Sequence, residues 1–196
     1  MQRFNFLAAA ASVALIGGLA ASADADVLLT VDLSTPNQVT INATTGLSAA
    51  TVSGSDTTGA LMAGFYGSPA PAGLIYSNGA GNLTNFLNPP DNSPGLFSST
   101  GETGLNIWTW SSDATVNFTA GVQAFSGSAT WTVTAAEYAA LLGGPAGGDL
   151  YFPADDDGDI GNATLLGQWS LANVPEPASA SVMGLAGLVL LRRRRA

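Results

Sequence analysis

The chain of 196 residues has no cysteine and no histidine, and all five of its basic residues lie at its two ends, at Arg3 and at residues 192–195. Of its 14 acidic residues, only Asp24 and Glu176 lie outside residues 26–174, so this central part has a formal charge of 0 − 12 = −12. Such a surface repels nucleic acid and anionic membranes, because phosphate groups are bound by Lys and Arg. We therefore expect no nucleic-acid partner, whereas neutral glycans and divalent cations are compatible with this charge.

These absences also exclude most catalytic chemistry. Without cysteine there is no disulfide, thiol nucleophile or thiolate metal site. Without histidine there is no Ser-His-Asp triad and no histidine-ligated zinc, and a body without lysine cannot form a Schiff base. Two carboxylates suffice for glycoside hydrolysis, and the candidates for that role are Glu102, Asp113, Glu137 and Asp149. None of the four lies in a motif, so we expect a protein that is not an enzyme.

The N-terminus has the features of a secretory signal peptide. Arg3 gives a weakly positive start, and residues 6–21 form an apolar stretch of small side chains. Two overlapping Ala-x-Ala sites follow, Ala21-Ser22-Ala23 and Ala23-Asp24-Ala25, and such sites are typical of signal-peptide cleavage. We interpret residues 1–25 as a helical signal peptide that directs the chain to the secretion machinery, so the body is expected to be exported.

The C-terminus consists of three parts in a fixed order. The first is Val174-Pro175-Glu176-Pro177, which cannot lie inside a helix or a central strand, because proline fixes φ, lacks an N–H and favours an extended residue before it. The second is an uncharged stretch of 14 residues from Ala178 to Leu191, shorter than the about 20 residues of a full transmembrane helix. The third is a basic block, formed by Arg192, Arg193, Arg194 and Arg195.

This order predicts that residues 173–196 are a tail that holds the chain at a membrane through a short apolar helix until it is processed. Positive charge beside an apolar segment tends to stay cytoplasmic, so the arginines act as a membrane stop and the body lies outside the inner membrane. The alternative is an amphipathic or disordered C-terminus with a chance basic cluster. The apolar stretch has no polar face, which favours the membrane tail.

The motif at 174–177, the stretch Met183-Gly184-Leu185-Ala186-Gly187-Leu188 and the arginine block together resemble the PEP-CTERM sorting signal of exported bacterial proteins. The resemblance implies recognition by an exosortase, a membrane cysteine transpeptidase, with cleavage near the motif. It also implies an inner-membrane-anchored precursor, and a final location at the cell surface or in an exopolysaccharide-rich biofilm matrix. The resemblance covers the tail, and it names neither a fold nor an activity for the body.

The body, residues 26–172, has the length of a single domain, and its strongest patterns are β. Alternating, β-branched and aromatic residues favour strands, and the clearest candidates are residues 27–33, 38–42, 105–110, 129–134 and 165–171. Many short strands separated by Gly, Asn, Pro and Ser are typical of an all-β sandwich or jelly roll. One short helix is predicted from Ala135 to Leu142, because Thr134 and Glu137 can form a capping box and Gly143 follows the segment.

A candidate cation site lies at Asp155-Asp156-Asp157-Gly158-Asp159. Calcium takes about six to eight oxygen ligands, and alternating acids before a turn-forming glycine are similar to the start of an EF-hand loop. The EF-hand pattern also requires a glutamate at its twelfth position, where counting from Asp155 gives Leu166. The calcium hypothesis names Asp155, Asp157 and Asp159 as ligands, and the alternative is a solvated acidic turn.

Tryptophans form a second candidate binding feature. Trp108 and Trp110 are two apart in a predicted strand, so both face the same side of it, and exposed rings of this kind can stack on sugars. The alternative is that these two, like Trp131 and Trp169 in other predicted strands, belong to the core. Three functions therefore compete: a non-enzymatic surface or matrix protein, a carbohydrate-binding module, and a carboxylate hydrolase. The charge, the missing catalytic groups and the tail favour the first.

Overall fold

The computed structural model describes residues 25–55, 57–69, 74–76, 79–88, 94–108 and 115–173. These residues form an all-β protein with one short helix, as predicted. The predicted signal helix, the motif at 174–177, the apolar helix after it and the arginine block all lie outside the described residues. Within the described residues, no helix is long and apolar enough to cross a membrane.

Ten strands form one sheet, in the spatial order β5-β8-β9-β4-β13-β14-β1-β2-β12-β6. In chain order these are β1 (Val27–Asp32), β2 (Gln38–Ala43), β4 (Ala60–Met62), β5 (Leu74–Tyr76), β6 (Ala80–Gly81), β8 (Gly95–Ser98), β9 (Leu105–Trp108), β12 (Ser128–Thr132), β13 (Gly147–Phe152) and β14 (Thr164–Asn173). Two smaller sheets pair β3 (Val52–Ser55) with β10 (Thr115–Phe118), and β7 (Thr84–Asn85) with β11 (Phe125–Ser126). The helical elements are α1 (Ala135–Leu142) and a single 3-10 turn, η1 (Asp157–Asp159).

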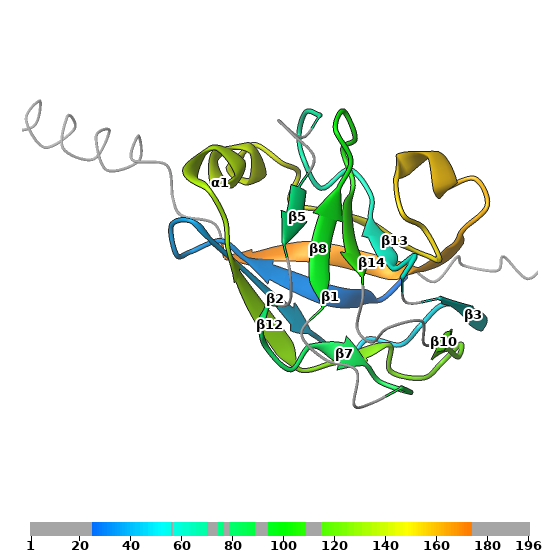
Figure 1. The fold of residues 1–196 in the computed structure, drawn as a ribbon. Coiled ribbons are helices and arrows are strands. Elements are labelled where there is room, and N and C mark those ends of the chain that lie inside the picture. The colour runs from blue at the N-terminus through cyan, green and yellow to red at the C-terminus, as the bar shows by residue number, and fades with distance from the viewer. Residues whose placement is uncertain are drawn as a thin grey trace, which may run out of the picture.

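The large sheet curls so far that its two edge strands come close together. β5 ends at Tyr76 and β6 begins at Ala80, and a chain of this length spans at most about 14 Å. Figure 1 shows β5 and β8 running across the direction of β1 and β14. Buried side chains from both parts of the sheet, among them Leu29 of β1 and Ile107 of β9, belong to one hydrophobic core.

The segments with the strongest sequence patterns form strands of the large sheet and the helix α1. The predicted strands at 27–33, 38–42, 129–134 and 165–171 are confirmed as β1, β2, β12 and β14, and the first part of the one at 105–110 is β9. The helix and its capping box are also confirmed. The hydroxyl of Thr134 accepts from the N–H of Glu137, and the Glu137 carboxylate accepts from the N–H of Thr134 at 2.8 Å. The Tyr138 hydroxyl donates to the carbonyl of Leu33, which fastens α1 to the end of β1.

β13 has no clear strand pattern, because Gly147-Gly148-Asp149 resembles a loop in sequence. In the structure this strand lies between β4 and β14, in the middle of the sheet. A Cβ added to Gly148 would lie 2.9 Å from Nε1 of Trp169, which donates to the Ala63 carbonyl at 3.3 Å. The glycine therefore leaves room for the buried indole, and packing rather than strand propensity decides the residue type.

The two ends of the described chain lie at opposite ends of the body. β1 and β14 run parallel, with Val27 opposite Gln168 and Asp32 opposite Asn173. The chain therefore leaves β14 beside the end of β1, close to α1 (Figure 1). The loop between β13 and β14, which holds the predicted calcium ligands, precedes β14 and so lies at the other end.

Candidate functional site

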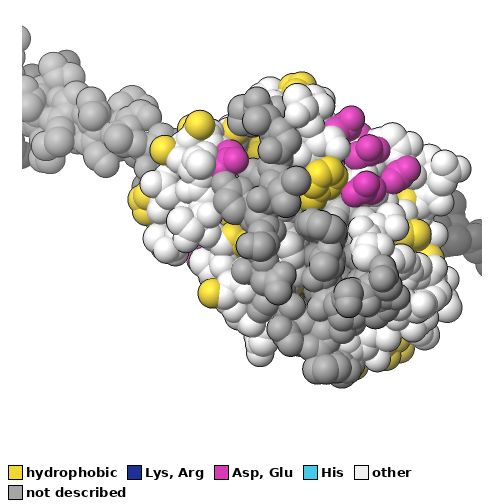
Figure 2. Space-filling view, viewed as in Figure 1, with side chains coloured by type: hydrophobic (Ala, Val, Ile, Leu, Met, Phe, Trp, Pro, Cys, Tyr) yellow, Lys and Arg dark blue, Asp and Glu magenta, His cyan; other side chains and the backbone are white. Residues whose placement is uncertain are grey.

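Acidic side chains gather at the end of the body that is remote from Asn173. Four of them lie in the loop between β13 and β14, and the fifth lies in the turn between β8 and β9. We call this group the acidic cluster: Glu102, Asp155, Asp156, Asp157 and Asp159. Figure 2 shows a dense group of acidic side chains on one part of the surface, and none of the described side chains on the face in view is basic.

Within the loop, two carboxylates bind backbone N–H groups of the same loop. Asp156 precedes η1, and its Oδ1 accepts from the N–H of Gly158 at 2.8 Å. Asp159 Oδ2 accepts from the N–H of Asp155 at 3.0 Å. Short acidic side chains favour such local bonds, which is why they are common in turns and at helix starts. These bonds explain how a run of like charges forms an ordered turn.

Asp157 instead connects the loop to the turn between β8 and β9. Its Oδ2 accepts from both the backbone N–H and the hydroxyl of Thr103, each at 2.8 Å. Its Oδ1 is buried and accepts no hydrogen bond from the other described groups. A Cβ added to Gly104 would lie 2.6 Å from that oxygen, so Gly104 allows the close approach. A carboxylate oxygen buried in this way carries an energetic cost, since it has given up water without gaining a donor.

Glu102 lies beside Asp157 and is affected by it. The pKa of Glu102 is raised, first because its protonated carboxyl hydrogen-bonds to Asp157, and further by partial desolvation and by the negative charges of Asp157 and Asp156. The pKa of Asp155 is raised as well, first by burial and then by the charges of Asp156 and Asp159. Glu102 and Asp155 therefore hold their protons at a higher pH than isolated carboxyls do.

The predicted calcium ligands do not form a ready coordination shell. Asp157 accepts from Thr103 and Asp159 accepts from the N–H of Asp155, so two of the three carboxylates are directed at different donors. Across the described ranges, no group of three or more His, Cys, Asp or Glu side chains is placed to hold a metal ion. Calcium at Asp155, Asp157 and Asp159 therefore stays a prediction.

The three described hydrolase candidates are not brought together as a pair. The carboxylate of Glu137 closes the capping box of α1, and Asp149 Oδ2 in β13 accepts from the Tyr151 hydroxyl at 3.3 Å. Glu102 contacts Asp157, and Asp113 lies outside the described residues. A glycosidase needs two carboxyls that face each other across a bond of the substrate, and the three described candidates lie on different elements, each with another partner.

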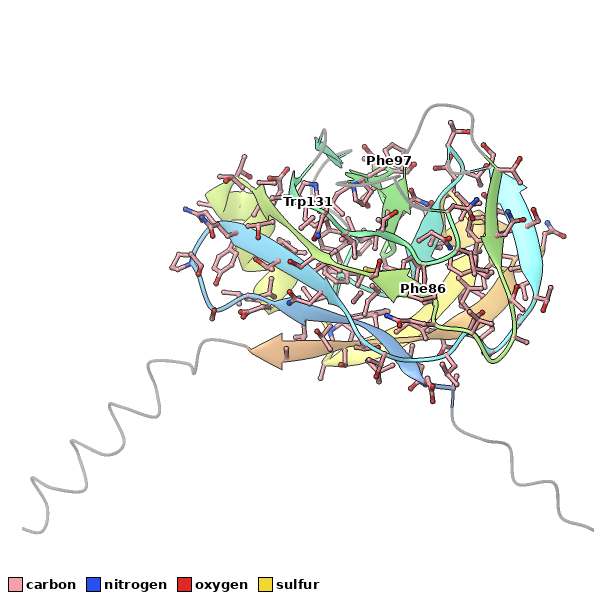
Figure 3. All side chains as sticks on the ribbon, turned by 90° about the horizontal axis from the view of Figure 1, so that it is seen from below. Phe86, Phe97 and Trp131 are labelled. Carbon is pink, nitrogen blue, oxygen red and sulfur yellow. The ribbon has the colours of Figure 1, made fainter. Side chains whose placement is uncertain are left out.

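The tryptophans that the structure describes are core residues. Trp131 is 2% exposed and Trp169 is 1% exposed, so for these two the core alternative is confirmed. Trp108 lies in β9, but its side chain is not among those described, and Trp110 lies outside the described residues. Figure 3 labels Trp131 together with Phe86 and Phe97, which lie at separate places on the body.

A clamp made of two asparagines was not predicted from the sequence. Nδ2 of the fully buried Asn85 donates to the Asn117 carbonyl at 3.1 Å, and its Oδ1 accepts from the N–H groups of Leu87 and Asn88, both at 2.9 Å. Asn88 accepts from the Asn117 N–H at 2.9 Å and donates to the Thr115 carbonyl at 3.2 Å. The two side chains thus make the hydrogen bonds to the backbone of Thr115 and Asn117 that a neighbouring strand would otherwise make at this edge of β10. The Asn-Phe-Leu-Asn-Pro sequence predicts only a turn.

No protein-family model, no curated protein and no solved structure matches this chain.

Proposed function

We propose that the chain is an exported, non-enzymatic surface or matrix protein, sorted by a PEP-CTERM tail that an exosortase removes. One observation carries the proposal: the motif, the apolar stretch and the arginine block follow one another in order, directly after β14 ends at Asn173. The last described strand of the body is paired with β1 up to Asn173. Cleavage within 174–177 would leave every described strand intact.

The body of this protein is, in our proposal, a β-sandwich of the jelly-roll kind. Support comes from the single core shared by β1, β2, β8 and β9, which belong to distant parts of one curled sheet. Sandwiches and jelly rolls bury one face of each layer against the other in this way. A rigid, highly acidic domain of this kind stays soluble and self-repelling in a polysaccharide matrix.

The proposal is tested by the mass of the exported product. The full chain is expressed in a bacterium that has an exosortase and in the same strain without it, and the terminal peptides are identified by mass spectrometry. In the first strain, we expect a product that starts near Asp26 and lacks residues 192–195. In the second strain, and for a Pro175→Ala, Glu176→Gln double variant in the first, we expect the arginines to remain.

A matched control is Asn162→Ala, which alters an exposed loop residue and should be processed like the wild type. Recovery of the intact arginine block on the exported wild-type product of the exosortase strain would refute the proposed sorting. Equal processing in the strain without exosortase would assign the cleavage to another protease.

A further inference from the structure

Phe86 is an exposed aromatic residue in the described part of the body. It follows β7, and its side chain is 43% exposed, while the adjacent Leu87 is 41% exposed. No other aromatic side chain in the described part of the chain is as exposed. Burial of a phenylalanine is among the larger single contributions to folding, and here that burial is incomplete. Single exposed apolar residues are common on proteins, so the position of Phe86 gains meaning only from what holds it there.

The asparagine clamp holds Phe86 outward. Asn85 is fully buried, and its amide fixes the backbone of Leu87 and Asn88 on one side and of Asn117 on the other. The N–H of Phe86 donates to the Ala124 carbonyl at 3.0 Å. The aromatic side chain therefore stands on a loop that is fastened to two other segments. Such a loop loses little conformational entropy when a ligand binds.

Uncharged polar side chains border this loop. Asn88 connects it to β10, where Thr115 and Asn117 are exposed and alternate with buried residues. Across the strand pair, Ser53 of β3 lies opposite Asn117, and its hydroxyl donates to Asn117 Oδ1 at 2.7 Å. None of these side chains carries a charge. An apolar ring beside hydroxyl and amide groups matches a sugar, which has an apolar C–H face and a rim of hydroxyls.

We propose that Phe86, with Leu87 and the exposed face of β10, binds a neutral polysaccharide chain. An anionic polysaccharide is disfavoured because the body has a charge of −12 with no basic residue to pair with it. A protein partner is disfavoured by size, since a stable protein interface buries about 800 Å² on each side around an apolar centre. Two adjacent apolar side chains in a polar surface give a small platform, suited to one or two sugar rings.

This inference adds a ligand to the proposed surface or matrix role, and it is tested separately from sorting. The full chain, purified in mild detergent, is run in native gels that contain hydroxyethyl cellulose, galactomannan or dextran, and its retardation gives an apparent affinity. The wild type should be retarded by at least one of these neutral polymers. Phe86→Ala should weaken that binding by about tenfold. Because the tail is present throughout, a failure of exosortase processing does not change the result.

Two variants serve as controls. Leu142→Ala removes a side chain that is 40% exposed on α1, so it lowers surface hydrophobicity equally without touching the platform, and it should bind like the wild type. Phe86→Tyr keeps an aromatic ring and should retain binding. Circular dichroism melting shows whether Phe86→Ala is still folded.

Four outcomes would overturn the inference. The first is the absence of retardation by all three polymers, and the second is unchanged binding by folded Phe86→Ala. The third is loss of binding in Trp110→Ala alone, which would assign the sugar to the tryptophan strand. If sedimentation instead shows that Phe86→Ala dissociates an oligomer, the platform is an interface between copies of this chain.

Discussion

The acidic cluster and the asparagine clamp are both built from short polar side chains in turns, yet they behave in opposite ways. In the clamp, Asn85 and Asn88 each donate and accept, so their amides satisfy backbone N–H and carbonyl groups together. In the cluster, Asp156, Asp157 and Asp159 only accept, and one oxygen of Asp157 is left buried without a donor. An amide can donate and accept as the backbone of a neighbouring strand does. A carboxylate can only accept, so it needs a donor for each of its oxygens.

The difference separates a structural role from a chemical one. The clamp closes the exposed edge of β10, an edge that otherwise could pair with another chain. The cluster has a negatively charged surface and a buried Asp157 oxygen without a donor. Its charge changes when its carboxyls bind or release protons. The effect of replacing a side chain should therefore grow with the number of hydrogen bonds that it makes to the backbone.

The largest effect is expected for Asn85→Ala. This change leaves the N–H groups of Leu87 and Asn88 and the carbonyl of Asn117 without their partner, and it opens a cavity. We expect a loss of about 3 kcal/mol in the free energy of unfolding, measured by urea denaturation. The control Asn162→Ala, at an exposed position, should change stability by less than about 0.5 kcal/mol. Equal effects of the two variants would show that the clamp does not hold β10.

An intermediate effect is expected for the pH dependence of stability. The folded pKa of Glu102 is raised above its ordinary value of 4.5, so above pH 4.5 the folded protein holds more protons than the unfolded chain. Stability from this group is fully present below pH 4.5 and is lost as the pH rises through the folded pKa. Glu102→Gln should reduce this fall, because a neutral amide can donate to Asp157 at every pH.

The measurement is a series of urea melts between pH 4 and pH 8. Asp155 also has a raised pKa, so the fall should become smaller in Glu102→Gln without disappearing. Leu142→Ala should keep the slope of the wild type. A slope that is the same in Glu102→Gln and the wild type would contradict the hydrogen bond from protonated Glu102 to Asp157.

The smallest effect is expected from calcium. Because the aspartates are directed at separate partners, calcium and magnesium at equal millimolar concentration should raise the melting temperature slightly and equally, by screening the repulsion. Asp157→Asn keeps an acceptor for Thr103 and should reduce the rise only a little. A saturable rise that is specific to calcium and absent in Asp157→Asn would instead establish the predicted site at Asp155, Asp157 and Asp159.

Several elements were predictable because their signals are local. The capping box of Thr134 and Glu137 needs only residues three apart, so α1 follows from its own sequence. β1 has a nearly continuous apolar and β-branched pattern that fits a buried strand. β13 was missed, since its Gly148 makes room for the indole of Trp169, which lies about twenty residues further along the chain.

The candidate site shows the same division. The Asp155–Asp159 run was visible as an acidic turn, but its contact with Glu102 and Thr103 joins segments 54 residues apart. Nothing local in the chain predicts that pairing, which depends on how the β8–β9 turn meets the loop before β14. The clamp could not be predicted for a similar reason, because Asn85 of β7 and Asn117 of β10 are 32 residues apart and meet only in the folded protein.

The sequence by itself determined the charge of the body, the catalytic groups that are absent from it, the all-β class and the order of the three parts of the tail, since each of these depends on composition or on neighbours along the chain. Tertiary structure alone decided which acid contacts Asp157, why Gly148 is required, and that Phe86 faces outward. Each of those results depends on atoms that the curled sheet brings together from distant segments.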